Sequence, residues 1–323
     1  MTSRGSRLDW LIFLALGFFW GSSYLFIKIG VDHGLEPFTL IAFRLLIGFG
    51  LLATVVAIAR EPLPRDPRMY GHLFVMGVIN IAIPFTLITF AEQTVDSSLA
   101  AVINSGVPLF VIVIAALFLK GETVTLNRVA GLVVGFIGVA ILVGFNVIDL
   151  GSANAVGELA LVGATISYAA GNVYAKAHVH GLRPMIPALF QVFFGLVVTA
   201  TLALATEHPL ATIPGPEALF AVVWLGLFGS GLAYLSYFRI LQHWGATRTS
   251  MVAYLLPVVG IVLGAIVLSE AVSPSTLLGG VLVVGGVALV NARIGTRPLF
   301  RQTVVRAPIE SLVPSQHPDH AAD

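Results

Sequence analysis

The sequence predicts an all-helical integral membrane protein in which ten transmembrane helices form two five-helix repeats of opposite orientation. Three observations lead to this fold class: an apolar composition, a set of marker residues that occurs twice, and a sorting of charges between alternate loops. The chain is 57% hydrophobic and only 10% charged, with 33 glycines and a mean hydropathy of +0.96. This composition is typical of membrane proteins and falls outside the range of soluble globular domains.

The marker residues recur at a spacing of about 148 residues. The matched positions are Pro37 with Pro184, Gly77 with Gly226, Pro108 with Pro257, Glu122 with Glu270, Gly131 with Gly279, and Gly138 with Gly286. If each copy holds an odd number of membrane helices, the two copies must lie in the membrane with opposite orientation. Inverted repeats of this kind are the architecture of secondary transporters.

A spanning helix needs about 20 apolar residues, and ten such runs can be marked off between short segments rich in charge, Pro and Gly. The first five cover residues 9–29, 38–59, 71–91, 98–119 and 126–146, and the second five cover 157–176, 185–205, 217–240, 249–269 and 275–293. Pro37, Pro216 and Pro274 are expected to open helices, because the first turn has no partner for an amide there. The repeats are therefore predicted at 9–146 and 157–293, followed by a disordered cytoplasmic tail at 295–323.

The basic residues support this count independently. With ten helices and a cytoplasmic N-terminus, every Lys and Arg falls in an inner segment except Lys28, at the outer end of the first helix, and Arg44, inside the second. The outer loops carry the acidic residues Asp32, Glu36, Glu92, Asp96, Asp149, Glu158, Glu207, Glu217 and Glu270. Because positive residues concentrate on the cytoplasmic side of short loops, we expect a multi-pass protein of the cytoplasmic (inner) membrane with both termini in the cytoplasm.

Several classes of function are excluded by what the sequence lacks. It has no cysteine, and hence no thiolate nucleophile or thiolate-bound metal. Its net charge is +1 and its basic residues are dispersed, which argues against a nucleic-acid partner. It has no phosphate-binding loop, no HExxH motif and no aspartate at the centre of a helix. We therefore predict no enzymatic activity, no cofactor and no metal site.

Neutral polar and aromatic residues at the middle depths of the helices are the candidates for a substrate path, together with one cation. Such groups turn away from lipid, either to bond between helices or to line a polar pocket at the repeat interface. The candidates are Trp20, Ser23, Tyr24, Arg44, Asn80, Asn104, Tyr168, Asn172, Gln191, Tyr234 and Tyr254. Ser22, Ser105, Ser230 and Tyr237 are further polar residues at this depth.

Arg44 lies about 10 Å inside its helix at 1.5 Å per residue, and an intramembrane cation there needs a partner or a wet cavity. One interpretation pairs it with Glu36, Glu92 or Asp96 from the outer side. The other assigns it to an outer gate or to a carboxylate of the substrate. Lys28, nearer the surface, is expected to extend its side chain to the interface.

Two prolines and two glutamates recur at matched positions. Pro108 and Pro257 each free a carbonyl inside the membrane, as hinges of alternating access or as static kinks. Glu122 and Glu270 close helices, where a carboxylate opposes the helix dipole. We expect them to bind the first amides of the helix that follows, with proton coupling as the alternative.

Small-residue spacing predicts close packing between the fifth and tenth helices or their neighbours. The residues concerned are Gly131, Gly135 and Gly138 in the fifth helix, and Gly279, Gly280, Gly285 and Gly286 in the tenth.

An ordered set of residues resembles the EamA-type exporters of the drug/metabolite transporter superfamily. The set runs from Trp20, Gly21, Ser22, Ser23 and Lys28 through Pro37 and Arg44 to Pro108, Gly121, Glu122, Gly131 and Gly138, and its ending repeats as Pro257, Glu270, Gly279 and Gly286. The resemblance implies ten helices in two inverted repeats, export of small metabolites from the cytoplasm, and no ATP-hydrolysing domain. The second copy lacks counterparts of Trp20 and Arg44, which align near Tyr168 and Gln191, so we expect the halves to differ in function.

These observations together predict a secondary transporter that exports small polar or zwitterionic, amino-acid-like metabolites by alternating access. Its partners are a small-molecule substrate and the lipid bilayer, and the driving force is the substrate gradient or protons. The alternatives are a multidrug exporter of lipophilic compounds and, from a different class, a non-transporting membrane scaffold. The sequence is compatible with a monomer or a homodimer.

Overall fold

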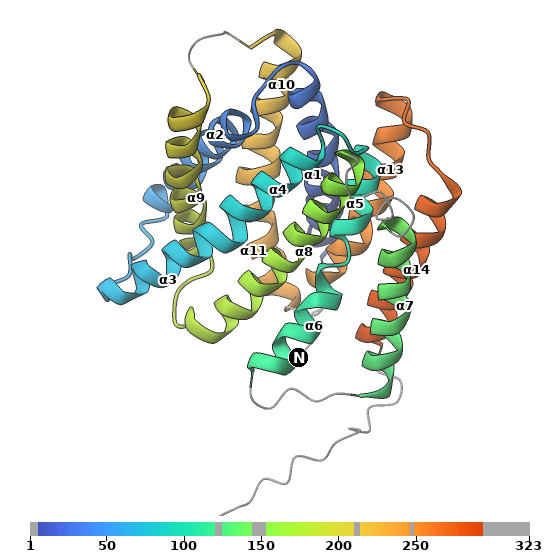
Figure 1. Ribbon diagram of the computed structural model, residues 1–323. Helices are drawn as coiled ribbons and strands as arrows, with labels where there is room; N and C mark the ends of the chain where they lie inside the picture. Colours follow the sequence, from blue (N-terminus) through green and yellow to red (C-terminus); the bar gives the residue numbers. More distant parts are fainter. Residues whose placement is uncertain (1–5, 120–124, 144–152, 210–213, 246–248, 293–323) are drawn as a thin grey trace, which may run out of the picture.

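The protein is all-helical, as expected. The computed structural model describes residues 6–119, 125–143, 153–209, 214–245 and 249–292, and the regular elements in these ranges are helices (Figure 1). The first half of the chain forms α1 (Arg7–Asp32), α2 (Pro37–Ile58), α3 (Pro67–Gly77), η1 (Val78–Ala82), α4 (Ile83–Ala91), α5 (Ser97–Asn104), α6 (Val107–Phe118) and α7 (Leu126–Val143). The second half forms α8 (Ala153–His178), α9 (Met185–Thr206), α10 (Pro216–Trp224), η3 (Leu225–Leu232), α11 (Ala233–Trp244), η4 (Ser250–Tyr254), α13 (Leu255–Val267) and α14 (Pro274–Asn291).

Local sequence signals set several helix starts. Pro37, Pro216 and Pro274 stand at the first position of α2, α10 and α14, as predicted. α1 begins with a capping box, in which Ser6 and Asp9 bond each other's backbone amides. Elsewhere apolar runs underestimate the helices: α3 begins at Pro67, capped by the Asp66 side chain, where hydropathy predicts a start at residue 71.

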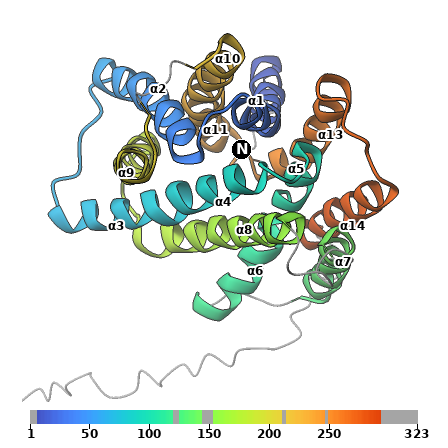
Figure 2. The ribbon, with the colours of Figure 1, turned by 45° about the horizontal axis from the view of Figure 1, so that its top comes forward.

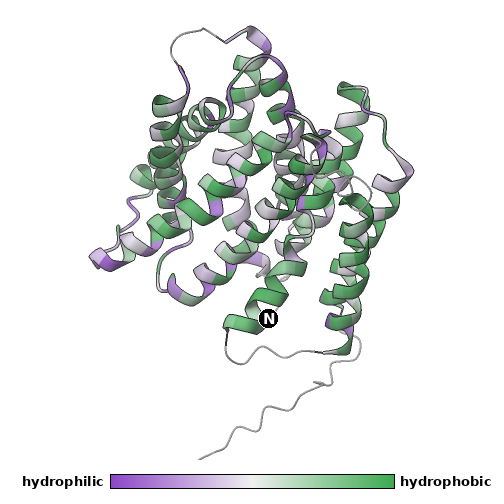
Figure 3. Ribbon diagram, viewed as in Figure 1, coloured by the Kyte–Doolittle hydropathy of each residue, from purple (hydrophilic) through white to green (hydrophobic). Residues whose placement is uncertain are grey.

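Within the described ranges, nine helical segments are long and apolar enough to cross a membrane. The tenth long helix, α8, has 26 residues but is not among them. Ten crossings therefore remain a prediction. Hydrophobic residues predominate along the helices (Figure 3), and many of them are exposed: Ile58 and Phe118, for example, are 78% and 77% exposed. An apolar exterior of this kind is suited to lipid.

Two helices at matching places in the repeats, α7 and α14, cross in opposite directions and lie side by side in both views (Figures 1 and 2). Gly131 meets Gly286, whereas Gly138 meets Gly279, so residue numbers rise along one helix as they fall along the other. Gly131 and Gly279 are equivalent positions, as are Gly138 and Gly286. The contact is therefore two-fold symmetric, and the two repeats are inverted with respect to each other.

Other contacts between the halves follow the same two-fold pattern. α2 packs against α9, its counterpart in the second repeat, and the two helices lie side by side in Figures 1 and 2. α2 also packs against η3, and correspondingly α9 packs against η1. The core therefore lies between the repeats, and each half covers helix surfaces of the other.

The third and eighth of the predicted membrane helices contain π-helical segments at equivalent places, η1 and η3, which begin next to the matched Gly77 and Gly226. Pro84 follows the first segment, but Ala233 stands at the corresponding place after the second. The proline therefore does not account for both interruptions. π-helical turns inside longer helices are frequent at functional sites.

Both mid-helix prolines lie next to interruptions larger than the expected kink. The fourth predicted membrane helix is broken at Ser105 and Gly106 into α5 and α6, and Pro108 is the second residue of α6. The ninth predicted membrane helix begins as the 3₁₀-helix η4, and Pro257 is the third residue of α13. Discontinuous helices in a membrane are tolerated where protein or a wet cavity satisfies the freed groups.

The glycine contact provides a sharp test of the packing. A Cβ atom on Gly286 would lie 2.5 Å from the Gly135 amide nitrogen and 2.6 Å from the Gly131 carbonyl oxygen, whereas one on Gly285 would meet nothing within 4 Å. We predict that Gly286→Ala lowers the free energy of unfolding by about 1–3 kcal/mol, as overpacking does. Gly285→Ala should stay within about 0.5 kcal/mol. Thermal unfolding in detergent, followed by size-exclusion chromatography, measures both, and equal effects would contradict the packing.

Candidate functional site

Two polar pairs, each joining the first repeat to the second, form the centre of the protein. In the first pair, Arg44 of α2 donates from Nε to Ser230 Oγ of η3 at 3.4 Å. In the second, Asn80 of η1 donates from Nδ2 to Gln191 Oε1 of α9 at 2.9 Å. Arg44 and Gln191 hold equivalent places, and the two π-helical segments supply their partners. The inverted repeats thus build the same contact twice, with a cation in only one copy.

The aromatic candidates are paired in the same way. Trp20 of α1 packs edge-on against Tyr234 of α11, with ring centroids 6.2 Å apart. The equivalent pair is Tyr168 of α8 and Phe85 of α4, 6.5 Å apart and also edge-on. Tyr237 adds to the first pair, 5.5 Å from Trp20. Aromatic rings therefore line both halves of the centre.

Arg44 is only 3% exposed, yet it forms no ion pair with a carboxylate in the described part of the chain. Its guanidinium instead lies 4.3 Å above the Phe85 ring, a cation–π contact. The predicted structural pairing of Arg44 with Glu36, Glu92 or Asp96 is therefore wrong. Those acids lie at the ends of the helices, beyond the depth at which the α2 backbone holds Arg44.

Two further candidates join in a hydrogen-bond chain beside Arg44. Asn104, the last residue of α5, donates from Nδ2 to the Tyr24 hydroxyl of α1, and the Thr165 hydroxyl of α8, which donates to the Leu161 carbonyl at 2.8 Å, lies 3.5 Å from Asn104 Oδ1. Tyr24, Tyr168, Tyr234 and Glu92 all lie within electrostatic range of the Arg44 guanidinium. The centre is therefore a cation surrounded by neutral polar and aromatic groups.

Glycines allow the polar side chains to approach each other. A Cβ atom on Gly229 of η3 would lie 2.8 Å from Ser23 Oγ and 3.3 Å from an Arg44 terminal nitrogen. At the equivalent place a Cβ atom on Gly171 of α8 would lie 2.8 Å from Asn80 Oδ1. Ser23 itself donates to the Phe19 carbonyl at 2.9 Å. The Asn80 Oδ1 atom is buried and has no hydrogen-bond partner.

Two candidates lie apart from this centre. Asn172 is exposed on α8. Tyr254 lies at the end of η4, where its hydroxyl accepts a hydrogen bond from Asn291 of α14 at 3.0 Å. Glu122 falls outside the described residues.

Glu270 binds the start of a helix, but a different helix from the one expected. Its Oε1 atom accepts from the Ser97 amide at 2.8 Å and hydroxyl at 2.7 Å, and its Oε2 atom accepts from the Ser98 amide at 3.0 Å and from the Ser98 hydroxyl. These residues open α5, in the other repeat, rather than α14, which follows Glu270 in the chain. Sequence order was misleading because the inverted arrangement brings remote helix ends together.

Sequence reasoning missed Glu207, which has a similar role. Its carboxylate accepts from the Phe38 amide at 2.9 Å and from the Thr39 amide and hydroxyl, both at 2.7 Å, at the start of α2. Carboxylates are favourable at helix N-termini because of the free amides and the dipole. Phe85, Thr165 and the glycines Gly171 and Gly229 were missed as well. Phe85 and the two glycines have no polar side chain that would distinguish them in the sequence from lipid-facing residues, whereas Thr165 has one.

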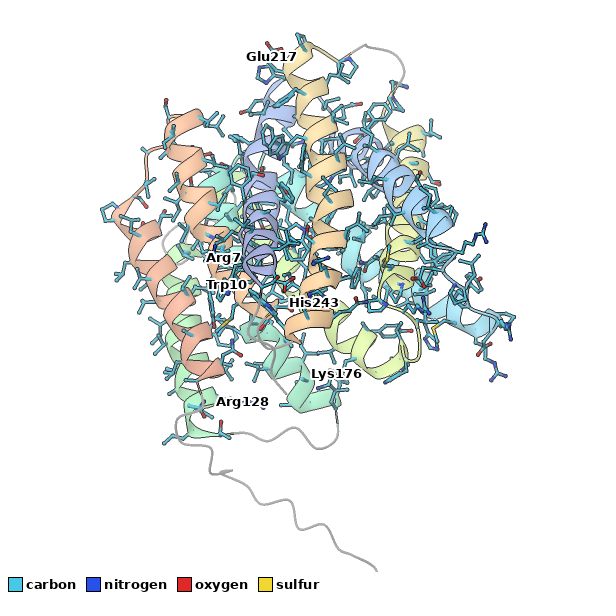
Figure 4. All side chains as sticks on the ribbon, turned by 180° about the vertical axis from the view of Figure 1, so that it is seen from behind. Arg7, Trp10, Arg128, Lys176, Glu217 and His243 are labelled. Carbon is cyan, nitrogen blue, oxygen red and sulfur yellow. The ribbon has the colours of Figure 1, made fainter. Side chains whose placement is uncertain are left out.

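The end of the molecule at which α1 begins and α11 ends is joined by contacts of Asp9 and by ion pairs of arginine. Asp9 of α1 contacts His243 at 2.9 Å and Arg239 at 3.4 Å, both on α11. Trp10 and His243 lie together at this end in Figure 4, and Glu217 lies at the other. Arg183 pairs with Glu61 at 2.9 Å.

An apolar groove on the outer surface is separate from the polar centre. It runs between α1, α10 and α13 and is lined by Phe18, Leu25, Phe26, Ile29, Glu217, Phe220, Trp224, Leu263 and Val267. Glu217 is its one charged lining residue, so the groove matches hydrocarbon better than a polar solute.

An all-helical membrane protein of two inverted repeats, with a polar centre between them, is the architecture of a membrane transporter. The chain matches the EamA-like transporter family over residues 9–144 and 155–292 and belongs to that family. It is accordingly a multi-pass membrane transporter whose partners are a small-molecule substrate and the lipid bilayer. This assignment supports the predicted membership of the drug/metabolite transporter superfamily.

Individual relatives agree with this class. The chain is 30% identical over 298 residues to the uncharacterized inner membrane transporter YedA of Escherichia coli strain K12, covering 91% of this chain and 93% of YedA. It is 24% identical to an uncharacterized transporter of Archaeoglobus fulgidus, covering 87% and 98%, and 28% identical to the protein PecM of Dickeya dadantii, covering 79% and 86%. A crystal structure of a protein at 21% identity superposes with a TM-score of 0.64, covering 88% of this chain and 99% of that one, which supports the fold.

The cap on α5 generates a stability prediction. Glu270→Gln keeps the shape of the side chain but removes the charge from four hydrogen bonds. We expect a loss of about 2 kcal/mol or more in the free energy of unfolding, since bonds to charged groups are worth about 1.5–3 kcal/mol each. Glu217→Gln, at an exposed position in the first turn of α10, should change it by less than about 1 kcal/mol. Thermal unfolding compares the two, and an unchanged midpoint for Glu270→Gln would show that the cap adds little.

Proposed function

We propose that this protein is a secondary transporter that exports small zwitterionic, amino-acid-like metabolites across the inner membrane by alternating access. The observation that carries the proposal is the buried Arg44, which has no carboxylate partner in the described part of the chain. We further propose the arrangement deduced from the loop charges, with both termini in the cytoplasm, and the two repeats at 9–146 and 157–293. The name of the relative YedA, an inner membrane transporter, supports this location.

A substrate carboxylate would complete the site chemically. An unpaired charge inside a protein is costly, and a guanidinium binds a carboxylate through two parallel hydrogen bonds. The Ser230 hydroxyl and the Phe85 ring are weak substitutes for such a partner. A ligand that brings a carboxylate therefore gains a charge-assisted contact that the protein leaves unfilled.

The rest of the centre suits the remainder of an amino acid. Rings such as Trp20 and Tyr234 attract an ammonium group at their faces and cover apolar atoms. The free Asn80 Oδ1 atom is an acceptor for an N–H or O–H group. A permanent cation would need an ionised carboxylate of the protein at the centre, and the proposed site includes none. A zwitterion is therefore favoured over a permanent cation.

Alternating access is supported by the places where helices are interrupted. The π-helical segments and the breaks before Pro108 and Pro257 occur at matching positions, so each repeat has the same two points of bending. Exchange of conformations between inverted repeats would open the centre to either side in turn. The substrate gradient or a proton gradient would supply the driving force.

Transport assays test the proposal. The full chain, reconstituted in proteoliposomes, is loaded with a panel of unlabelled amino acids, and counterflow of the labelled ones is measured alongside uptake of cationic dyes. We expect amino-acid counterflow. Dye transport without amino-acid transport would instead support a multidrug exporter, for which the aromatic rings at the centre provide the argument.

Arg44 gives a residue-level prediction. Arg44→Met should weaken the apparent affinity for a transported amino acid about tenfold to a hundredfold, the equivalent of one charge-assisted contact of about 1.5–3 kcal/mol. Arg44→Lys should be intermediate, because lysine keeps the charge without the fork. Arg183→Gln, which removes an ion pair on an arginine 67% exposed, is the matched control and should leave affinity unchanged. Normal affinity in a folded Arg44→Met protein would remove Arg44 from recognition.

A further inference from the structure

Glu92 is a buried acid that none of the contacts described above explains. It follows the last residue of α4, and it is 0% exposed. Neither of its carboxylate oxygens has a hydrogen-bond partner. Buried carboxylates are normally paired or hydrogen-bonded, because an isolated ionised one is costly. Glu92 is therefore held in a setting that suits an uncharged carboxylic acid.

A cation lies beside Glu92 but does not bind its carboxylate. Lys28 of α1 donates from Nζ to the Glu92 main-chain carbonyl at 2.9 Å. The same ammonium pairs with Asp32, one turn later in α1, at 3.3 Å. The Lys28 ammonium therefore binds the Asp32 carboxylate but not the Glu92 carboxylate. The lysine side chain is long and flexible.

Charged and titratable groups reach Glu92 from several elements. α1 contributes Lys28, Asp32 and Tyr24, and α2 contributes Arg44. Glu270, in the connection between α13 and α14, lies within electrostatic range of Glu92. Asp96, just before α5, is exposed, and Glu158 lies on α8 next to Gly157, which packs against Ala91 and Val95.

The balance of these groups favours the proton. Burial raises the pKa of Glu92 well above its usual range, and Glu270 and Asp32 act in the same direction, whereas Lys28 and Arg44 oppose them. The sign follows from linkage. An arrangement that raises the pKa of an acid is stabilised when the pH lies below the ordinary pKa of that acid. It loses this stabilisation as the pH rises through the raised pKa.

The position of Glu92 indicates what the proton controls. The same end of the molecule is joined by Glu270 at the start of α5, by Glu207 at the start of α2, and by Lys28 at the Glu92 carbonyl. By the loop charges this is the outer end. Opening it would admit water to Glu92, and a carboxylate formed there could take Lys28 away from Asp32.

We propose that Glu92 is a proton-binding site that controls the outer end of the transporter: it is protonated while that end is closed, and ionised and paired with Lys28 when it opens. The proton passes to the outer water on opening and returns from it on closing. Because Arg44 lies within electrostatic range, ionised Glu92 also weakens the hold of Arg44 on a substrate carboxylate. This last step rests on the proposed function, whereas the proton site itself does not.

Two measurements that need no substrate test the site. Infrared difference spectra of the full chain in lipid, recorded across a pH series, report the carbonyl band of a protonated carboxylic acid. We expect the wild type to lose such a band as the pH rises, Glu92→Gln to lack it at every pH, and Asp96→Asn to behave as the wild type. Asp96 is the matched control because it is an exposed acid four residues away that caps α5 without a side-chain hydrogen bond.

Hydrogen–deuterium exchange of the peptide covering residues 88–100, corrected for the intrinsic effect of pH, reports opening. It should increase with pH in the wild type and stay low in Glu92→Gln, which mimics the protonated acid. Glu92→Asp keeps a titratable group and should shift the pH of the change, which guards against a folding defect in the amide variant. A band or an exchange profile in Glu92→Gln identical to that of the wild type would overturn the proposal, even if the protein transports amino acids as expected.

Discussion

Contact between the backbones of the two repeats is the constraint on which the rest of the structure depends. At Gly131, Gly138, Gly279 and Gly286 the helices α7 and α14 approach so closely that a single added carbon would meet backbone atoms. In a membrane, helices gain little from hydrophobic association, so close packing has to hold them together. The symmetry of this contact fixes the inverted arrangement. It also brings together the starts and ends of helices that are remote in sequence, which is why Glu270 and Glu207 can bind the first amides of α5 and α2.

Inversion also explains how a polar centre can form between π-helical and broken helices. Each interruption frees backbone groups inside the membrane, and these need partners. The Ile79 carbonyl of η1, for example, accepts a hydrogen bond from the Ser167 hydroxyl of α8 at 2.6 Å, across the boundary between the repeats. One half thus satisfies the irregular backbone of the other. The irregular places are where Asn80 and Ser230 project, so the same feature that needs support also positions the site.

The two halves share geometry but not chemistry. The contact between the second helix of one repeat and the π-helical segment of the other joins Arg44 to Ser230 in one copy, and Gln191 to Asn80 in the equivalent copy. The aromatic pairs differ in the same manner, with Trp20 and Tyr234 in one copy of the contact between the repeats and Tyr168 and Phe85 in the other. A symmetric frame that carries a single cation gives the centre a polarity. A ligand with distinct ends would therefore bind in one orientation.

The sequence by itself determined the fold class, the family and the glycine contact. Composition, helix length and small-residue spacing are local properties, and the membrane constrains each of them directly. It also identified most of the residues at the centre, since polar groups at that depth must turn inward. Only the tertiary structure decided which of them meet. It removed Asn172 and Tyr254 from the centre, left Arg44 without a carboxylate, and placed Glu92 in a closed setting beside Lys28. Such outcomes depend on how helices from opposite repeats are rotated and offset, and a hydrophobic period along one helix carries no information about its distant partner.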